Sequence, residues 1–143
     1  MSLTMDDRDG FIWLDGKLVP WRESRMHVLT HALHMGGAVF EGMRAYGGHV
    51  FLNAPHLERF QQSAALLDYH LPWSQGELTQ AIEAVLWANQ LDDAYIRPVA
   101  WRGAESYTLL LALSSVTIIP EADKVLERAP TYQLNQLVPI ARF

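Results

Sequence analysis

The chain has 143 residues, half of them hydrophobic and 19% charged, which suits one folded domain with a core and excludes disorder of the whole chain. The formal net charge is −5 with only 11 lysines and arginines, so we expect neither a nucleic-acid-binding nor a membrane-binding surface. There is no cysteine, which excludes disulfides and thiolate chemistry and fits a cytoplasmic location.

Two antiparallel hairpins are predicted in the first 52 residues. Asp15-Gly16-Lys17 lies between two short apolar runs, and Asp-Gly in that setting is a strong hairpin signal. Gly47-Gly48 lies in the same way between an expected strand at 38–46 and another at 49–52. The chain is therefore expected to begin as antiparallel sheet.

Two helices are predicted after the second hairpin. Asn53 can cap the first helix, Pro55 suits its first turn, and the apolar residues that follow recur at helical spacing. Ser74-Gln75-Gly76-Glu77 is a capping-box pattern and is expected to begin the second helix. Leu91-Asp92-Asp93 is expected to follow its end.

Strands are predicted again at 94–102 and 107–119, where leucine and β-branched residues accumulate. Strands, two helices and further strands are typical of an α+β fold, an antiparallel sheet with two helices packed on one face. Residues 1–119 are expected to form this small α+β sandwich domain. Residues 120–143 lack a clean period, and we interpret them as a tail or a truncated interdomain linker.

Three histidines, His27, His31 and His34, stand at i, i+4 and i+7 and would share one face of a helix. Such a face could bind a metal ion, but there is no HExxH glutamate and no fourth ligand can be named. Gly36-Gly37 follows directly and leaves room for only a very short helix. We therefore interpret the histidines as bonding to the backbone of a turn and expect no metal site.

Glu41 and Arg44 place two charges in the otherwise apolar strand expected at 38–46. Buried strands normally shed charge, so the pattern favours the wall of a polar pocket. In a regular strand these two residues point to opposite faces. Arg44 could bind a carboxylate, or the segment could be an edge strand with a solvated face, and the pattern supports both interpretations equally.

Three more residues could take part in binding. Arg59 stands on the first predicted helix, where a guanidinium could bind phosphate, although an exposed helix arginine is the simpler interpretation. Tyr95 and Arg97 alternate on one strand face, which fits carboxylate recognition and an ordinary outer face alike. No Gly-x-Ser-x-Gly elbow or lysine-bearing phosphate loop is present, which argues against hydrolases and nucleoside-triphosphate enzymes.

Five blocks between about Phe11 and Glu105 resemble branched-chain amino-acid aminotransferase, a fold-type IV enzyme that depends on pyridoxal phosphate. In chain order the blocks are Trp13-Leu14-Asp15-Gly16 with Trp21, His31-Ala32-Leu33-His34-Met35-Gly36, Val39-Phe40-Glu41-Gly42-Met43-Arg44, His56-Leu57-Glu58-Arg59-Phe60 and Ala94-Tyr95-Ile96-Arg97-Pro98. They occur at the family's spacing. The resemblance implies amino-group transfer between branched-chain amino acids and 2-oxoglutarate, and a small α+β domain beside a larger one.

The resemblance also implies roles for single residues. Arg59 matches the arginine that binds the cofactor phosphate, which replaces the simpler interpretation above. Phe40 matches a wall of the apolar side-chain pocket. Arg44, Tyr95 and Arg97 match residues around the substrate, where an arginine can meet a carboxylate.

The chain also departs from the family. Met35 stands where the family commonly has a tyrosine, so the pocket loses a hydroxyl and substrate preference is in question. Similarity fades from Tyr107, and nothing aligns beyond Pro120. The family's larger domain supplies the Schiff-base lysine, and neither Lys17 nor Lys124 lies in that context. Because that lysine is both nucleophile and base, we expect the chain alone to be inactive and not to bind pyridoxal phosphate stably.

Two functions therefore stay open. The first is an incomplete aminotransferase, acting on amino acids and 2-oxo acids when complete. The alternative is a non-catalytic, self-associating or partner-binding module of the same fold. A domain that evolved to pack against another exposes an apolar face when alone, so a homo-oligomer is expected in either case.

Overall fold

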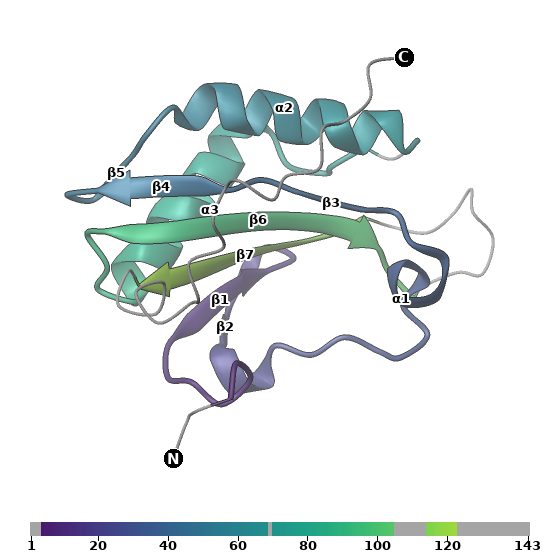
Figure 1. The fold of residues 1–143 in the computed structure, drawn as a ribbon, viewed down its shortest axis with the longest axis horizontal. Coiled ribbons are helices and arrows are strands. Elements are labelled where there is room, and N and C mark those ends of the chain that lie inside the picture. The colour runs from purple at the N-terminus through teal and green to yellow at the C-terminus, as the bar shows by residue number, and fades with distance from the viewer. Residues whose placement is uncertain (1–3, 69, 105–113, 123–143) are drawn as a thin grey trace, which may run out of the picture.

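The computed structural model describes residues 4–68, 70–104 and 114–122. Its antiparallel sheet has the strand order β2-β1-β7-β6-β4-β5, with β3 also paired to β6, and it carries α2 and α3 (Figure 1). The strands are β1 (Phe11–Leu14), β2 (Lys17–Pro20), β3 (Ala38–Phe40), β4 (Met43–Tyr46), β5 (His49–Val50), β6 (Ala94–Arg102) and β7 (Ser114–Ala122). The helices are the 3-10 turn η1 (Trp21–Glu23), α1 (His31–Met35), α2 (Asn53–Leu66) and α3 (Gln75–Ala88).

Both predicted hairpins are confirmed. β1 and β2 join through Asp15 and Gly16, which have φ angles of 46° and 90° and so suit a tight two-residue turn. β4 and β5 join through Gly47 and Gly48 in the same way, with Tyr46 opposite His49, although β5 ends at Val50 and not at the expected residue 52. Local turn chemistry thus decides the first sheet contacts.

The strand predicted at 38–46 is present but interrupted, because Glu41 and Gly42 lie between β3 and β4. The pairings with β6 keep the same register on both sides of this gap, so no residue is inserted. Glu41 lies opposite Pro98, and its N–H donates to the Pro98 carbonyl at 3.0 Å. Proline has no N–H to return the second hydrogen bond, which explains the interruption.

The two predicted helices are confirmed, with one correction. The capping box at Ser74 is formed, and Glu77 bonds back to the Ser74 N–H at 2.8 Å. Asn53 does not cap α2: the cap position is Leu52, in the left-handed region at φ 49°. The Asn53 side chain instead donates to the Thr79 hydroxyl at 2.8 Å, which ties α2 to α3.

The last predicted strand is only partly described. Residues 107–113 lie outside the described residues, and β7 runs from Ser114 to Ala122, past the expected end at residue 119. The rest of the predicted tail, 123–143, also lies outside the described residues.

The core lies between the sheet and the two longer helices. Its buried side chains come from α2, α3 and one face of the sheet: Trp13, Met43, Ala45, Leu57, Phe60, Ala64, Leu78, Ala81, Ile82, Val85, Leu86, Ala94, Ile96, Ala100, Val116 and Ile118. The opposite face of β6 carries the residues that alternate with these. No helix in the described ranges is long and apolar enough to cross a membrane.

Candidate functional site: a polar cluster on the open face of the sheet

The sheet face that α2 and α3 leave uncovered, here called the open face, gathers four of the five predicted site residues. Phe40 and Arg44 alternate with the buried positions of β3 and β4, so they point to the open face. Tyr95 and Arg97 do the same on β6. The antiparallel register places Arg44 directly opposite Tyr95, which brings the two strands' contributions together.

Arg97 is the centre of this group. Its guanidinium carbon lies 5.2 Å from the Tyr95 ring centroid and 5.8 Å from the Phe40 ring centroid. Its Nε also donates a long hydrogen bond of 3.4 Å to the Tyr95 hydroxyl. Arg97 is exposed, so its cation and the two aromatic rings that it contacts are offered to a ligand together. That combination suits a ligand with a carboxylate beside an apolar side chain.

Gly42 is required by this arrangement and was not singled out from the sequence. A Cβ at position 42 would lie 2.8 Å from the Tyr95 hydroxyl and 3.3 Å from the ring. The phenol of Tyr95 therefore lies across the glycine backbone. The sequence signal was a glycine inside a strand pattern, which often marks such a close approach.

Arg44 also belongs to the open face and is half-buried. Its guanidinium carbon lies 5.5 Å from the ring centroid of Tyr46, two residues along the same strand. Arg44 and Arg97 therefore each contact an aromatic ring, and both are positioned on adjacent strands to attract an anion.

Two hollows lie along the open face. The larger, about 750 Å³, includes Arg97, Trp21, Arg25 and Ile119 in its lining. The smaller, about 280 Å³, is mostly apolar and includes Val99 and Trp101. The predicted site residue Arg97 thus lines a cavity on this face, next to an apolar one.

Arg59 lies on the other side of the sheet edge, where it pairs with Glu41. Arg59 Nε donates to Oε1 of Glu41 at 2.7 Å and Nη2 donates to Oε2 at 2.6 Å, a two-point ion pair. His56, one helical turn earlier, lies with Nδ1 2.8 Å from the same Oε2. The Glu41 side chain is 6% exposed and that of Arg59 is 61% exposed.

The electrostatics of this pair follow from its hydrogen bonds. The Arg59 guanidinium, with a smaller contribution from His56, lowers the pKa of Glu41 although burial opposes the shift. Glu41 raises the pKa of Arg59 in return. A carboxylate 2.8 Å from a ring nitrogen requires a proton between them, so we assign that proton to Nδ1 of His56.

Phe40 and Glu41 connect the two groups, because successive strand residues point to opposite faces. The open-face residues and Arg59 therefore lie on opposite sides of the sheet at β3. Sequence reasoning found Arg59 through the family resemblance, and it missed His56. The signal available was the i, i+3 spacing of His56 and Arg59, which places both on one helix face.

Two of the three histidines of the turn make the backbone contacts expected for them. His27 Nδ1 accepts from the Leu29 N–H at 3.1 Å, and His34 Nε2 lies 3.3 Å from the Leu29 carbonyl, to which it donates. α1 is only five residues long. The described part of the chain contains no group of three or more metal-ligating side chains. His27 and His34 thus contact backbone as predicted, whereas Nδ1 of His31 is buried without a hydrogen-bond partner among the described residues, and the structural role of the histidines stays a prediction.

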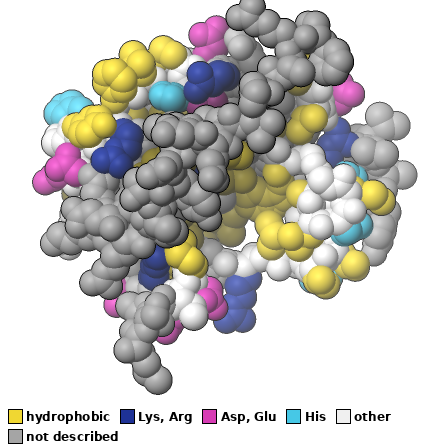
Figure 2. Space-filling model, in the orientation of Figure 1, with side chains coloured by type: hydrophobic (Ala, Val, Ile, Leu, Met, Phe, Trp, Pro, Cys, Tyr) yellow, Lys and Arg dark blue, Asp and Glu magenta, His cyan; other side chains and the backbone are white. Residues whose placement is uncertain are grey.

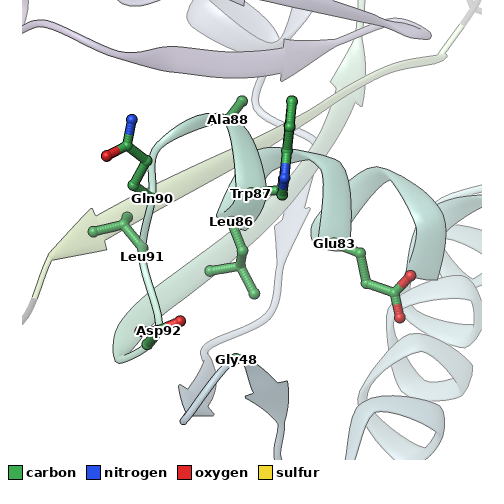
Figure 3. Close-up of a pocket in the computed structure, with 8 residues that line it drawn as sticks. All are labelled: Gly48, Glu83, Leu86, Trp87, Ala88, Gln90, Leu91 and Asp92. Atoms are coloured by element: carbon green, nitrogen blue, oxygen red, sulfur yellow. The ribbon is translucent and has the colours of Figure 1, made fainter.

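A further hollow of about 550 Å³ lies between the end of α3 and the β4–β5 turn (Figure 3). Trp87, Leu86 and Gly48 are part of its lining, and its charged residues are Glu83 and Asp92. Two carboxylates and no cation make this hollow unsuitable for a phosphate or a carboxylate ligand. None of the predicted site residues lines it.

Lys17 lies far from both the open-face residues and the Arg59–Glu41 ion pair. It begins β2 at one end of the sheet and is exposed, while β1 and β7 separate it from β6. Lys124 lies outside the described residues. Among the described residues, therefore, no lysine lies beside Arg44, Tyr95 or Arg97.

The comparisons with known proteins agree with this architecture. The family model described as amino-transferase class IV matches residues 38–140, which extends past Pro120, the point beyond which no resemblance was expected. The branched-chain-amino-acid aminotransferase of Pseudomonas aeruginosa is 42% identical over 121 residues, which are 82% of this chain and 39% of that protein. A probable branched-chain-amino-acid aminotransferase of Rickettsia bellii is 40% identical over 129 residues, 90% of this chain and 45% of that protein.

Solved structures give the same result. The Escherichia coli branched-chain amino acid aminotransferase has a TM-score of 0.73 and 33% identity, and the match covers 80% of this chain and 41% of that one. A second branched-chain amino acid aminotransferase, solved with pyridoxamine 5'-phosphate, has a TM-score of 0.74 and 37% identity, with 80% and 41% covered. The chain thus spans about two fifths of the length of the relatives it matches. The α+β fold is that of these enzymes, and the chain belongs to the class IV aminotransferase family.

Proposed function

We propose that this chain is the small domain of a pyridoxal-phosphate-dependent enzyme that transfers amino groups between branched-chain amino acids and 2-oxoglutarate. The named relatives support the reaction, and the pyridoxamine 5'-phosphate in one related structure supports the cofactor. In this proposal residues 1–119 form the domain, to which the end of β7 adds residues 120–122, and the remainder of 120–143 is a tail or linker. The cytoplasmic location stays a prediction.

The observation that carries the proposal is the geometry of the open face. Arg97 lies between the rings of Phe40 and Tyr95, and Arg44 stands across from Tyr95. A branched-chain substrate has a carboxylate next to an apolar side chain, and this surface offers cations next to apolar rings. In our proposal Arg44 and Arg97 attract the carboxylate, and Phe40 contacts the side chain.

The residues present fit one end of the cofactor. Arg59 is largely exposed, and among the described residues its Nη1 has no hydrogen-bond partner. A guanidinium with one free edge suits a phosphate. Pyridoxal phosphate, when bound, supplies an electron sink for chemistry at the substrate's α-carbon. Arg59 would hold its phosphate, and Tyr95 and Arg97 would orient the substrate.

The same proposal holds that this chain alone neither transfers amino groups nor binds the cofactor stably. Amino-group transfer needs an amine beside the cofactor as nucleophile and base. Lys17 is at the far end of the sheet, and no other lysine lies among the described residues. Glutamate formation from leucine and 2-oxoglutarate, with pyridoxal phosphate and the 143-residue chain, is therefore expected to equal the protein-free rate. Turnover above that rate would contradict this part of the proposal.

The ligand test uses 4-methylvaleric acid, which has a carboxylate and a branched apolar chain and is present in a related structure. In NMR titrations we expect shifts at Phe40, Tyr95 and Arg97, and loss of those shifts in Arg97→Gln. Lys17→Gln removes the same charge far from the site and should bind like the parent. Shifts that are equally large in Arg97→Gln would refute the proposed site.

Self-association is the second candidate function, and a specific surface favours it. Val28, Leu33, Met35 and Phe40 are between 58% and 75% exposed and lie along one segment of the chain. Figure 2 shows hydrophobic side chains on the surface around α1. An apolar surface of this kind favours a homo-oligomer. Leu33→Glu is expected to shift the mass seen by light scattering toward the monomer, and a parent chain that is monomeric at high concentration would refute the idea.

A further inference from the structure

We infer that Glu41 is the positioning residue for Arg59, and that it holds the guanidinium side-on so that the opposite edge faces an incoming phosphate. The inference rests on the proposed function for the identity of the anion. It rests on the structure for the arrangement of the ion pair. Neither the family resemblance nor the comparisons assign a role to Glu41.

The ion pair uses only one side of the Arg59 guanidinium. Glu41 binds Arg59 through Nε and Nη2, which is one side of the guanidinium plane. Nη2 also lies 3.1 Å from Nδ1 of His56, whereas among the described residues Nη1 has no hydrogen-bond partner. The N–H groups of Nη1, on the edge away from Glu41, are therefore the ones left to meet a phosphate oxygen.

The two partners differ in burial. The side chain of Glu41 is 6% exposed and lies between β3 and β4, whereas that of Arg59 is 61% exposed. Free arginine side chains lose much rotamer freedom when they bind an anion. A fixed carboxylate at the base of the side chain removes that freedom before the anion arrives, so less is lost on binding.

Both the side chain and the backbone of Glu41 are hydrogen-bonded. Oε2 accepts from Nη2 of Arg59 and also lies 2.8 Å from Nδ1 of His56. The Glu41 N–H is bonded to the Pro98 carbonyl. The carboxylate therefore has a defined position, as a residue that orients another side chain requires.

A competing effect must be weighed. The Glu41 charge also repels an anion and partly neutralises Arg59, which would weaken phosphate binding. The anion would meet the exposed end of Arg59, whose side chain is 61% exposed, and there solvent and salt screen part of the repulsion. The entropy that is saved by holding the Arg59 side chain in place does not depend on salt. At physiological ionic strength, therefore, the positioning of Arg59 by Glu41 should strengthen phosphate binding by more than the Glu41 charge weakens it.

The experiment uses the 143-residue chain with two readouts. The first is the 15N NMR signal of Arg59 Nε–H, which should be protected from exchange in the parent and averaged in Glu41→Gln. The second is a titration with inorganic phosphate at about 0.15 M salt. We expect phosphate to bind about five- to tenfold more weakly in Glu41→Gln. Tighter binding in that variant would overturn the inference, because it would show that repulsion dominates.

Two further variants separate position from charge. Glu41→Asp keeps the negative charge but is too short to bridge both nitrogens, so it should also weaken phosphate binding. Glu58→Gln removes a charge from the exposed residue next to Arg59 and should bind phosphate no more weakly than the parent. Glu41→Asp also serves if Glu41→Gln fails to fold. Parent-like binding in Glu41→Asp would overturn the inference.

Failure of the inference and failure of the proposed function give different results. If the Arg59 signal is protected in the parent and averaged in Glu41→Gln, positioning holds. Absence of any phosphate response in the parent would then refute the phosphate role of Arg59 alone. If Arg59 exchanges equally fast in both chains, the positioning inference fails whatever phosphate does.

Discussion

Phe40 and Glu41 are neighbours in the chain, and they reverse the usual distribution of apolar and charged residues. Phe40 is 64% exposed on the open face, whereas Glu41 is buried on the face that packs against the helices. On the helix side, apolar side chains pack together, and the buried carboxylate of Glu41 is balanced by Arg59 and His56. On the open side, rings and cations remain accessible. The difference teaches that an exposed phenylalanine beside a paired, buried charge marks the boundary between core and site.

The largest expected effect is on the free energy of unfolding, when a phenylalanine of the core and one of the open face are each replaced by alanine. Phe60 is fully buried, so Phe60→Ala should lower the free energy of unfolding by about 3–5 kcal/mol. Phe40→Ala should change it by less than about 0.5 kcal/mol, because the ring is already mostly in water. Urea unfolding followed by tryptophan fluorescence measures both. Similar losses in the two variants would show that Phe40 is a core residue.

The next prediction concerns pH and the buried carboxylate. Because Arg59 lowers the pKa of Glu41 in the folded state, the ion pair stabilises the fold above the unfolded-state pKa, which is about 4.3. That contribution is lost as the pH falls through the lower, folded-state pKa. The stability difference between the parent and Glu41→Gln should therefore be steady from about pH 7 to 5 and shrink by at least about half below about pH 4.

Urea unfolding at a series of pH values tests this, with Glu58→Gln as the control for an exposed carboxylate on α2. A difference between parent and Glu41→Gln that grows on acidification would contradict the lowered pKa.

Gly42→Ala should affect the open face more than the core. The added Cβ meets the hydroxyl of Tyr95, the far end of a side chain, which can move at little cost. Stability should fall by less than about 1 kcal/mol, while the Tyr95 and Arg97 signals shift and 4-methylvaleric acid binds more weakly. Gly16→Ala is the matched control: its φ of 90° makes the change straining, but it lies far from the site. Unaltered binding in Gly42→Ala would show that Tyr95 needs no close approach.

The smallest effect is expected from Tyr95→Phe. The hydroxyl accepts a single long bond of 3.4 Å from Arg97, so its loss should change stability by less than about 0.5 kcal/mol. The ring stays in place beneath Arg97, and binding of 4-methylvaleric acid should change about twofold at most. A roughly tenfold loss in the NMR titration would mean that the hydroxyl itself contacts the ligand.

Much of the fold could be predicted from the sequence because its signals are local. Asp15-Gly16 and Gly47-Gly48 specify tight turns by their backbone freedom, and Ser74 with Glu77 specifies the start of α3. Asn53 shows the limit of such rules. Its side chain could have capped α2, but it donates to the hydroxyl of Thr79 on α3, 26 residues away.

The candidate site was predictable in part. The alternation of strand residues predicted that Glu41 and Arg44 point to opposite faces, and that Tyr95 and Arg97 share one. The family resemblance supplied Arg59 and Phe40. Alternation alone could not show that β6 lies beside β3 and β4, because strand order depends on the packing of the whole sheet.

The sequence by itself determined the turns, the helix start at Ser74 and the faces to which single strand residues point, because each depends on neighbours a few residues apart. Only the tertiary structure decided which partners meet. It placed Pro98 opposite Glu41, the Tyr95 ring over Gly42 and Arg59 against a carboxylate 18 residues away. The reason is physical: these contacts follow from sheet register and helix packing, which the core sets by burying apolar surface and which no local pattern encodes.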